Sequence, residues 1–594
     1  MRRLLLILST IFLGWATLVI ATRGVQFRIV GVLFRSRDPE RALAIGLVLL
    51  LIHVFFFRES FTRDTDRVAA AGRRWLPILA LGCALWLVVH AVRYGAFTAG
   101  GSDSYAYVSQ AYAWAGGVLP RAQPIPVSVP WPSADASLAP LGYCPGPQPH
   151  TIVPTYAPGL PLMMAAALVL GACGPFLVVP LCAGLVVWQT YRLGHRTSGP
   201  WAGMLATALV TVSPIVVFQS MSPMTDVPVA ALWTGAAVAA LGGTRRSAFA
   251  TGLWTAAAHL VRPNLPALPL VLLVHLALSV RGRERWIRMA LFSVAAVPAA
   301  IAIATLYTAW HGSPWNSGFG SAAEIFAAKN ILPNLARYPV WLWQSQSPLI
   351  LLAFVPLLPP FRSDADRPAT RLLVALFLAT LISYLVYFVF EEWWYLRFLL
   401  PAIPALLVLM STGMVALGRR LPRPWGRVVV IAVTLLLLAH AMRFNVGHGM
   451  FGTMKEAEGR YAEVGAYIHE ALPRNAVVLS LQHSGSVRFY GGRMTIRWDL
   501  IDRDWTARAA GELERLGLRP YMVIEDWELP AMRDRFGFAP DAPVPWPLVA
   551  RMQSPIGVSV LDLSSNPAQA APADLAPGRA PRCSAPQPIL IRPE

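Results

Sequence analysis

Residues 397–443 read RFLLPAIPALLVLMSTGMVALGRRLPRPWGRVVVIAVTLLLLAHAMR. Two apolar runs, 397–417 and 426–442, flank a short segment that carries Arg419, Arg420, Arg423 and Arg427. Each run approaches the roughly 20 residues that a helix needs to cross the hydrocarbon core of a bilayer. This stretch therefore predicts two membrane-spanning helices joined by a basic turn.

The same pattern extends over most of the chain, which has 594 residues, 56% of them hydrophobic and only 14% charged. An average soluble domain is about one-quarter charged, so this composition argues against a soluble multidomain enzyme. Further apolar runs lie at 4–22, 42–57, 75–94, 176–192, 200–218, 226–242, 247–260, 264–280, 287–310, 346–360 and 371–390. We therefore expect a polytopic α-helical membrane protein with about 13 transmembrane helices.

The basic residues predict how these helices are oriented. The net charge is +19, and nearly all of the basicity comes from arginine. Arginines cluster in segments 58–74, 192–199, 243–247, 281–288, 361–371 and 418–427, whereas the alternate segments 95–175, 219–225, 261–264, 311–345 and 391–396 contain few. Such an excess marks the cytoplasmic side of a membrane protein, so the pattern favours membrane topology over binding of nucleic acid. Segment 21–41 is an exception, because it is basic although the number of spans before it places it outside the cytoplasm.

The run 157–170 is apolar but short and begins with prolines. A crossing at this point would invert every later loop, so we expect a helix that lies in the outer interface or re-enters it. We divide the membrane part into N-terminal helices at 1–94 and a transmembrane module at 95–443, with the large outer loop 95–175.

After residue 442 the composition becomes that of an ordinary soluble protein. Helix-like runs at 456–472, 504–516 and 527–536 alternate with strand-like runs at 476–481, 494–500 and 521–525. Residues 444–565 therefore predict a small α/β domain outside the cytoplasm. Residues 566–594 are rich in Pro and Ala and predict a disordered tail.

The five cysteines show no CxxC spacing, which gives no support to a cysteine zinc site. Cys83, Cys173 and Cys182 lie in apolar runs and are expected to be core thiols. Cys144 and Cys583 could pair outside the cytoplasm or remain unpaired.

Two acids stand at the predicted outer ends of spans. Asp103 opens the large outer loop, and Asp226 begins the sixth span. A partly desolvated carboxylate such as Asp103 could act as a general base. Both acids also have a plain structural interpretation as helix N-caps, because each precedes a helix-like run.

Two arginines on the predicted outer side suit an anionic ligand. Arg262 lies in a short loop, and Arg397 begins a span. Bidentate contact between guanidinium and phosphate is strong and directional. Glu391, Glu392 and Tyr395 precede Arg397 and could contact a polar head group or belong to an interfacial aromatic belt. We find no phosphate loop, dinucleotide fingerprint, HExxH or GxSxG motif, and the histidines are scattered.

Seven segments, taken in order, carry a resemblance to a known family. They are SDSYAYVSQAYAWAGG, TYAPGLPLMMAAALVLGACGP, WQTYRLGHRTSGPWAGMLATALVTVSP, QSMSPMTDVP, HLVRPNLPALPL, LRFLLPAIPALLVL and, in the C-terminal part, SVRFYGGR. The chain resembles integral-membrane glycosyltransferases of the GT-C class, especially the bacterial relatives of protein O-mannosyltransferases and of the lipid A aminoarabinose transferase (glycosyltransferase family 39). The likeness covers roughly residues 95–417.

The resemblance implies an inverting glycosyltransferase in a bacterial inner membrane. It would move a sugar from a polyprenyl-phosphate-linked donor to a hydroxyl of a protein, lipid or polysaccharide acceptor at the outer face. Asp103 would deprotonate the acceptor, Arg262 and Arg397 would stabilise the departing phosphate, and Asp226 would orient sugar or acceptor. The residues expected to bind substrate are Tyr105, Tyr107, Tyr156, Glu391, Glu392 and Tyr395.

Many members of the family have Asp-Glu in the first outer loop, whereas here Ser104 follows Asp103. We therefore expect no metal ion and no other cofactor. The expected partners are the lipid-linked donor, the acceptor and membrane lipids, without nucleic acid. Two alternatives are a transporter or flippase of lipid-linked sugars and a non-enzymatic envelope scaffold.

Overall fold

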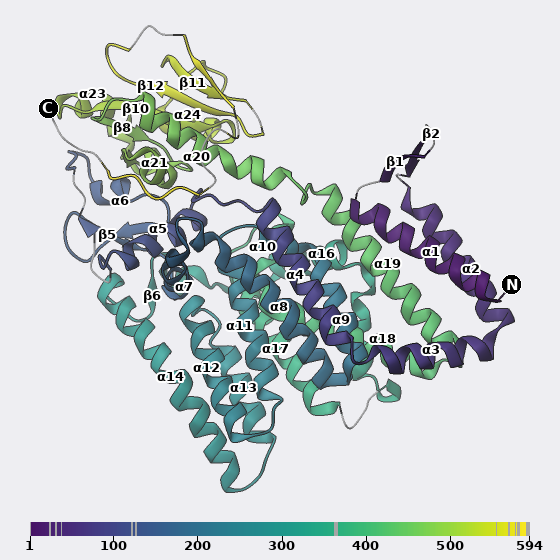
Figure 1. The fold of residues 1–594 in the computed structure, drawn as a ribbon. Helices are drawn as coiled ribbons and strands as arrows, with labels where there is room; N and C mark the ends of the chain where they lie inside the picture. Colours follow the sequence, from purple (N-terminus) through teal and green to yellow (C-terminus); the bar gives the residue numbers. More distant parts are fainter. Residues whose placement is uncertain are drawn as a thin grey trace.

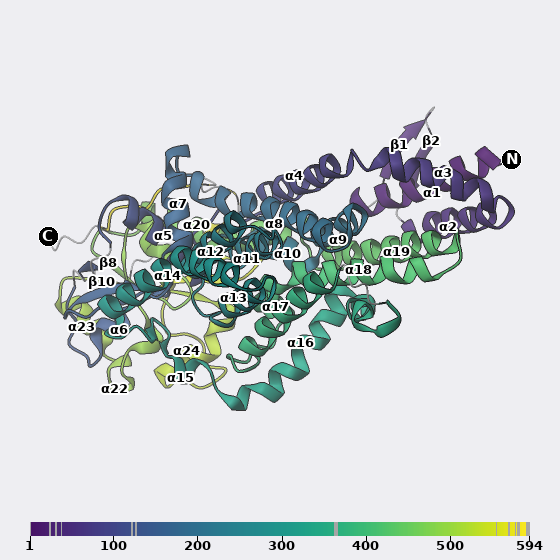
Figure 2. The ribbon, with the colours of Figure 1, turned by 90° about the horizontal axis from the view of Figure 1, so that it is seen from below.

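The computed structural model describes residues 2–22, 25–29, 32–36, 38–119, 123–124, 127–361, 366–553, 555–567, 571–576, 578 and 583–589. Long helices form a bundle, and the C-terminal part of the chain covers one end of it (Figure 1). The N-terminal elements gather at one side of the molecule (Figure 2), where the helices among them contact α19 (Trp425–Gly447). They are α1 (Arg2–Thr22), β1 (Val25–Ile29), β2 (Val32–Ser36), α2 (Pro39–Phe56) and α3 (Arg58–Gly72).

The bundle is built from apolar helices of unequal length. Its α-helices are α4 (Leu76–Tyr94), α8 (Gly174–Ser198), α9 (Pro200–Val212), α10 (Pro214–Ser220), α11 (Asp226–Ala240), α12 (Arg245–Val261), α13 (Ala267–Leu278), α14 (Arg283–His311), α16 (Ile331–Gln346), α17 (Arg367–Leu385), α18 (Ile403–Arg420) and α19. Three 3-10 segments continue or precede them: η3 (Pro348–Leu357), η4 (Pro359–Phe361) and η5 (Trp393–Ala402).

Within the part of the chain that the structure describes, seven helices are long and apolar enough to cross a membrane, or up to nine if each of two bent pairs is one span. The structure therefore supports a multi-pass membrane protein with fewer full-length spans than the 13 expected. The runs 226–242, 247–260 and 264–280 form α11, α12 and α13, which have 15, 17 and 12 residues. Helices of this length cover only roughly 18–26 Å of a core about 30 Å thick.

Burial distinguishes the helices at the centre of the bundle from those at its rim. The segment Trp393–Arg420, which joins η5 and α18, has 94% of its apolar window buried, and α8 has 72%, against 28% in α14 and α19. Nearly every residue of α11 is buried as well. A helix that is apolar on all sides can be either a core helix or a span, and only packing distinguishes the two.

The loop between α4 and α8 is folded rather than extended. It contains α5 (Asp103–Ala115), α6 (Ala134–Leu138), α7 (Gly159–Ala167), η1 (Leu168–Leu170) and an antiparallel sheet in the order β3-β5-β4 (Gln123–Pro124, Thr151–Pro154 and Tyr143–Pro145). The predicted interfacial run is α7 with η1, which at about 18 Å is too short to cross. A second connection, between α14 and α16, holds β6 (Asn316–Ser317), β7 (Gly320–Ser321), α15 (Ala322–Ile325) and η2 (Ala328–Asn330).

The C-terminal part contains a six-stranded mixed sheet in the order β13-β11-β12-β10-β8-β9. Its strands are β8 (Ala476–Leu479), β9 (Met494–Ile496), β10 (Arg519–Glu525), β11 (Leu548–Met552), β12 (Val558–Asp562) and β13 (Ala573–Leu575). Its helical segments are α20 (Thr453–Ala471), α21 (Ser484–Gly491), η6 (Trp498–Leu500), α22 (Arg503–Thr506), α23 (Ala509–Arg515), η7 (Asp526–Glu528) and α24 (Leu529–Phe536). The three predicted strands lie at β8, β9 and β10, whereas α21 and the last three strands were not predicted.

Two predictions about the C-terminal tail are wrong. Part of 566–594 is ordered, since β13 pairs with β11 and the Gln587 N–H donates to the Phe489 carbonyl at 2.8 Å. Cys583 forms a disulfide with Cys173, so Cys173 is not a core thiol and Cys144 is not the partner of Cys583. Sequence spacing does not show which cysteines meet after folding. Residues 568–570, 577, 579–582 and 590–594 of the tail lie outside the described ranges.

The loops sort to two ends of the bundle. Residues from 100–104, 224–226, 261–264 and 394–398 line one cavity, and residues from 356–371 and 412–420 line a pocket elsewhere. Helix α17 connects the two, because Arg367 at its start lines the pocket and Tyr387, just beyond its end, lines the cavity. The two predicted groups of loops are thus kept at opposite ends.

Candidate active site

A cavity of about 610 Å³ lies where the helical bundle meets the C-terminal part. The start of α5, the turn between α10 and α11, the turn between α12 and α13, and the start of η5 contribute its charged residues. These four places are far apart in sequence and were all predicted to lie outside the cytoplasm. They bring together Asp103, Asp226, Arg262 and Arg397.

Both carboxylate oxygens of Asp103 accept a hydrogen bond. The Tyr156 hydroxyl donates to Oδ1 in a short hydrogen bond, and Arg397 Nη1 donates to Oδ2 at 3.1 Å. The side chain keeps 25% of its surface exposed, and that of Arg397 keeps 17%. Asp103 is therefore a paired but accessible carboxylate at the cavity wall.

Asp226 forms the second acid–arginine pair. Arg262 Nη2 donates to Asp226 Oδ1 at 2.8 Å and to Thr225 Oγ1 at 2.7 Å. The Asp226 side chain is only 1% exposed and that of Arg262 13%. Because Asp226 is almost fully covered, it fixes the arginine and has little surface left for a substrate.

The helix ends decide between the two interpretations of these acids. Asp103 and Asp226 are the first residues of α5 and α11, and the cap positions are Ser102 and Thr225. Neither cap residue makes a side-chain capping hydrogen bond. The capping interpretation of both acids is therefore wrong, since their carboxylates bind arginines instead.

Burial and charge set the protonation states around the pairs. Burial raises the pKa of the Tyr156 hydroxyl well above its ordinary value, and the charge of Asp103 raises it further. Tyr156 therefore stays protonated and is the donor in its hydrogen bond to Asp103. Burial opposes the charge of Arg262, but Asp226, Tyr384 and Tyr107 outweigh it and raise the pKa of this guanidinium. Arg262 therefore stays cationic at any working pH.

Aromatic side chains surround the charged groups. The Tyr107 hydroxyl lies 3.3 Å from Thr225 Oγ1, and the ring centroids of Tyr107 and Tyr156 are 4.7 Å apart. The guanidinium of Arg397 lies 5.2 Å from the ring centroid of Tyr395, a cation–π distance. Tyr107, Tyr156 and Tyr395 all line the cavity. Their expected role in binding substrate stays a prediction.

Three other predicted residues are not brought to the cavity. Tyr105 is buried against α21, where its ring lies against Gly485 and pairs with Tyr143 at 5.9 Å. Glu391 pairs with Arg337 at 3.1 Å and is 85% exposed. Neither Glu391 nor its neighbour Glu392 lines the cavity. The acid–aromatic pattern at 391–395 could not show which side chains point inward.

Several residues of the site were missed by the sequence analysis. Tyr384 OH donates to Asn264 Oδ1 at 3.4 Å beside Arg262, and Asn264 lines the cavity. A tyrosine inside the apolar run 371–390 was the available signal for Tyr384. The C-terminal part adds cavity-lining residues that carried no such signal: Glu458, Arg460, Tyr461 and Gln482.

A buried ionic network holds this C-terminal wall. Arg460 Nε donates to Glu525 Oε1 at 2.7 Å, and His483 Nε2 lies 3.0 Å from the same oxygen. The Tyr461 hydroxyl accepts from Arg460 Nη2 at 2.7 Å and from Gln482 Nε2 at 3.0 Å. Burial alone would raise the pKa of Glu525, but His483 and Arg460 lower it to about 2. Glu525 and Arg460 are therefore both charged at neutral pH.

Among the described residues, no group of three or more His, Cys, Asp and Glu side chains could hold a metal ion. The expectation that the reaction needs no metal stays a prediction.

The structure is similar to two solved states of ArnT from Cupriavidus metallidurans. The apo state has a TM-score of 0.51 and 14% identity over 84% of this chain and 99% of that one. The state bound to undecaprenyl phosphate has a TM-score of 0.51 and 14% identity over 82% and 98%. The Archaeoglobus fulgidus oligosaccharyltransferase with Zn and sulfate has a TM-score of 0.52 and 11% identity over 77% and 68%.

No protein-family model and no curated protein matches the sequence. The structural similarities show that the chain has the GT-C fold, so the resemblance seen in the sequence is confirmed at the level of the fold.

Proposed function

We propose that this chain, which has the GT-C fold, is an inverting glycosyltransferase. It moves a sugar from a polyprenyl-phosphate donor to an acceptor hydroxyl, at the face of a bacterial inner membrane that lies outside the cytoplasm. The observation that carries the proposal is the meeting of Asp103, Arg262 and Arg397 around one cavity at one end of the bundle. A base beside two cations is what transfer from a lipid phosphate requires.

The comparison with ArnT supports the choice of donor. That protein was solved with undecaprenyl phosphate bound, and it shares the fold of this chain. A membrane-held anionic lipid reaches a cavity at the end of a helical bundle by lateral movement. The two guanidiniums of the cavity then match the charge of its phosphate.

Asp103 is the base in this proposal. The acceptor O–H bond breaks as its proton passes to the Asp103 carboxylate, and the oxygen attacks the anomeric carbon opposite the phosphate. The bond from the anomeric carbon to the phosphate oxygen breaks with its electron pair, which leaves polyprenyl phosphate. Attack from the opposite face inverts the anomeric configuration.

Arg397 couples donor binding to the activation of this base. Arg397 Nη1 donates a hydrogen bond to Oδ2 of Asp103, and the Tyr156 hydroxyl donates one to Oδ1. A donor phosphate competes for Arg397 and draws it away from Asp103. One carboxylate oxygen then becomes free for the acceptor hydroxyl, so donor binding precedes acceptor activation.

Arg262 is the fixed partner of the phosphate. Asp226 and Thr225 hold its Nη2, while its Nη1 makes no hydrogen bond within the described part of the chain. Nη1 is buried, and the Arg262 side chain keeps 13% of its surface exposed at the cavity. The charge of this guanidinium stabilises the negative charge that develops on the departing phosphate.

The test is Asp103→Asn in the full-length protein, with Asp135→Asn as the matched control. Asp135 lies in the same loop and pairs with His150 at 3.1 Å outside the cavity. Envelope glycans of cells that lack the protein, or carry either variant, are compared by mass spectrometry. We expect Asp103→Asn to reduce transfer by about 100-fold or more, with Asp135→Asn like wild type.

Undecaprenyl phosphate binding by the purified Asp103→Asn protein shows that the variant is folded. Restoration of the glycans by Asp103→Asn would refute the assignment of the base. Movement of labelled lipid-linked sugar into vesicles without any acceptor would instead support a flippase and contradict the transferase.

A further inference from the structure

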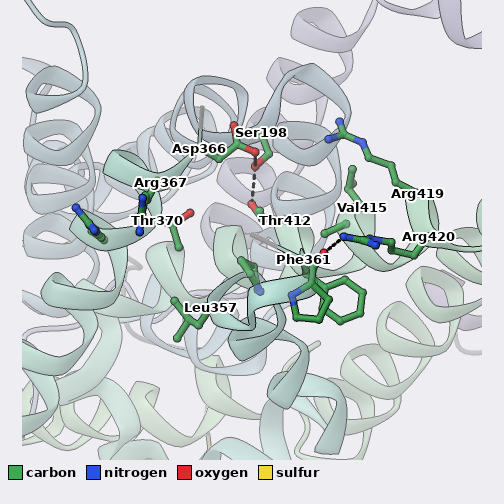
Figure 3. Close-up of a pocket in the computed structure, with 14 residues that line it drawn as sticks. Ser198, Leu357, Phe361, Asp366, Arg367, Thr370, Thr412, Val415, Arg419 and Arg420 are labelled. Carbon is green, nitrogen blue, oxygen red and sulfur yellow. Dashed lines mark hydrogen bonds between the residues drawn. The ribbon is translucent and has the colours of Figure 1, made fainter. Parts of the chain in front are cut away.

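A second cavity, of about 170 Å³, lies at the end of the bundle opposite the active-site cavity. It is formed where the end of α8, the start of α17, the end of α18 and the 3-10 segments η3 and η4 come together (Figure 3). Its polar lining includes Ser198, Asp366, Arg371, Thr412, Arg419 and Arg420. None of these residues takes part in the proposed transfer.

The pocket carries more positive charge than the described residues neutralise. Within the described part of the chain, Arg371 and Arg419 make no hydrogen bond or ion pair, although both line the pocket. Arg420 donates to the Pro360 carbonyl and lies over the Phe361 ring at 5.9 Å. Asp366 is the one acid among the described lining residues.

Asp366, the acid of the pocket, accepts a hydrogen bond from a neighbouring hydroxyl group. Ser198 Oγ lies 3.4 Å from Asp366 Oδ2 and 3.1 Å from Thr412 Oγ1 (Figure 3). When Ser198 donates to the carboxylate, the Thr412 hydroxyl can donate either to Ser198 or to a ligand. The pocket therefore offers hydroxyl donors between arginines that stand on α17 and α18.

The remaining wall of the pocket is apolar. Leu357 lies opposite Ser198 and Asp366 in Figure 3, and Val415 lies beside Arg420. A guanidinium cluster next to an apolar wall matches a ligand with an anionic head and a hydrocarbon stem. Basic pockets between transmembrane helices bind anionic lipid head groups in this way.

We propose that this pocket binds a phosphate group, and that Arg371 and Arg419 are its principal ligands. The phosphate belongs to an anionic lipid or is free in solution, and the apolar wall favours the lipid. The segments that build the pocket are those that the arginine count places in the cytoplasm, and the inner leaflet there is rich in anionic phospholipid. Since the proposal needs no transfer reaction, it stands apart from the proposed function.

The experiment uses the full-length protein in detergent and three probes: phosphatidylglycerol, phosphatidylcholine and inorganic phosphate. Binding is measured by native mass spectrometry and by the shift in Tm. We expect wild type to retain phosphatidylglycerol over phosphatidylcholine, and Arg371→Gln/Arg419→Gln to weaken that binding by about tenfold or more, because each arginine–phosphate contact is charge-assisted.

The matched control is Arg281→Gln/Arg283→Gln. It removes the same charge from the exposed turn between α13 and α14, at the same end of the bundle but outside the pocket. A second variant, Arg371→Lys/Arg419→Lys, keeps the charge but loses the bidentate geometry, and we expect intermediate binding.

Equal binding of phosphatidylglycerol by wild type and Arg371→Gln/Arg419→Gln would overturn the proposal, as would equal loss in the control. Stabilisation of wild type, but not of the double variant, by inorganic phosphate alone would support the site and identify a soluble phosphate as its ligand. A double variant that melts like wild type without lipid excludes loss of folding as the cause.

Discussion

At the scale of single residues, the site consists of two acids that each hold one arginine. The pairs differ in exposure, since Asp103 is 25% exposed and Asp226 1%. The exposed pair can exchange partners with a substrate, and the buried pair cannot do so without leaving an uncompensated charge. The same residue types therefore serve two roles, and burial decides which role each pair has.

This difference predicts how variants bind the donor lipid. We expect Arg397→Ala to weaken binding of undecaprenyl phosphate by about 10- to 100-fold, the value of a charge-assisted hydrogen bond. Asp103→Asn should bind at least as tightly as wild type, because Arg397 is then released. Native mass spectrometry of the purified protein measures both, with Arg337→Ala as the control outside the cavity. Unchanged binding by Arg397→Ala would contradict the proposed role.

A second prediction at this scale concerns pH. Glu528 is buried and accepts N–H groups from Glu525 at 2.8 Å and from Gln482 at 3.1 Å. Burial outweighs these donors and raises the pKa of Glu528 from 4.5 to about 7. Its contribution to stability is therefore complete below the unfolded pKa and is lost as pH rises through about 7.

We expect the free energy of unfolding to fall by about 2 kcal/mol between pH 5 and pH 8 on account of Glu528. Glu528→Gln should remove this slope, even if the variant is less stable at every pH. Thermal melting of the full-length protein across this pH range measures it. If the unfolding free energy of Glu528→Gln changes with pH as much as that of wild type, another group causes the pH dependence.

At the scale of elements, the placement of Asp103 depends on the connection between α4 and α5. Gly100 and Gly101 lie near the end of this connection, and the ring of Tyr461 from α20 lies directly on Gly100. A Cβ at residue 100 would overlap that ring. The C-terminal part therefore contacts the loop that leads to Asp103, the proposed base.

We expect Gly100→Ala to displace this loop and reduce transfer by about tenfold or more, since small misplacements of catalytic groups are costly. Gly459→Ala is the control, because a Cβ there meets open space on α20. Transfer activity and Tm are measured for both variants. Activity of Gly100→Ala equal to that of the control would show that the contact does not position Asp103.

Short helices also explain the difference in span number. Apolar composition predicted the helices at α11, α12 and α13, but it did not predict that they stop short of full membrane thickness. Helix α11 is enclosed by its neighbours on nearly every side. A core helix and a span present the same sequence pattern, so their lengths and surroundings must come from the structure.

At the scale of the whole molecule, the bundle and the C-terminal part together line the candidate active-site cavity. The disulfide between Cys173 and Cys583 joins the start of α8 to the C-terminal tail. Disulfides persist in oxidising compartments, which supports placing this end of the molecule outside the cytoplasm. The same end holds the active-site cavity.

We expect Cys583→Ser to lower the free energy of unfolding by about 2–4 kcal/mol, the usual effect of removing a cross-link. Cys144→Ser should have no such effect, because Cys144 is a free thiol beside His311. Melting under non-reducing conditions and peptide mapping measure the outcome. A Cys144–Cys583 peptide would restore the pairing that the sequence had suggested.

The sequence by itself determined the membrane class, the sorting of loops to two ends and the choice of four charged residues that meet at one cavity. These features follow from composition and from position along the chain, because apolar length and arginine placement are local properties. Two isolated acids and two isolated arginines at one predicted face were enough to indicate a site.

Only the tertiary structure decided the pairing of each acid with its arginine, the exclusion of Tyr105, Glu391 and Glu392, and the C-terminal wall of Arg460 and Tyr461. It also decided the partner of Cys583. Each of these depends on contacts between segments that lie far apart in the chain. Periodicity and composition hold no information about which distant side chains meet, because that is set by how the helices pack.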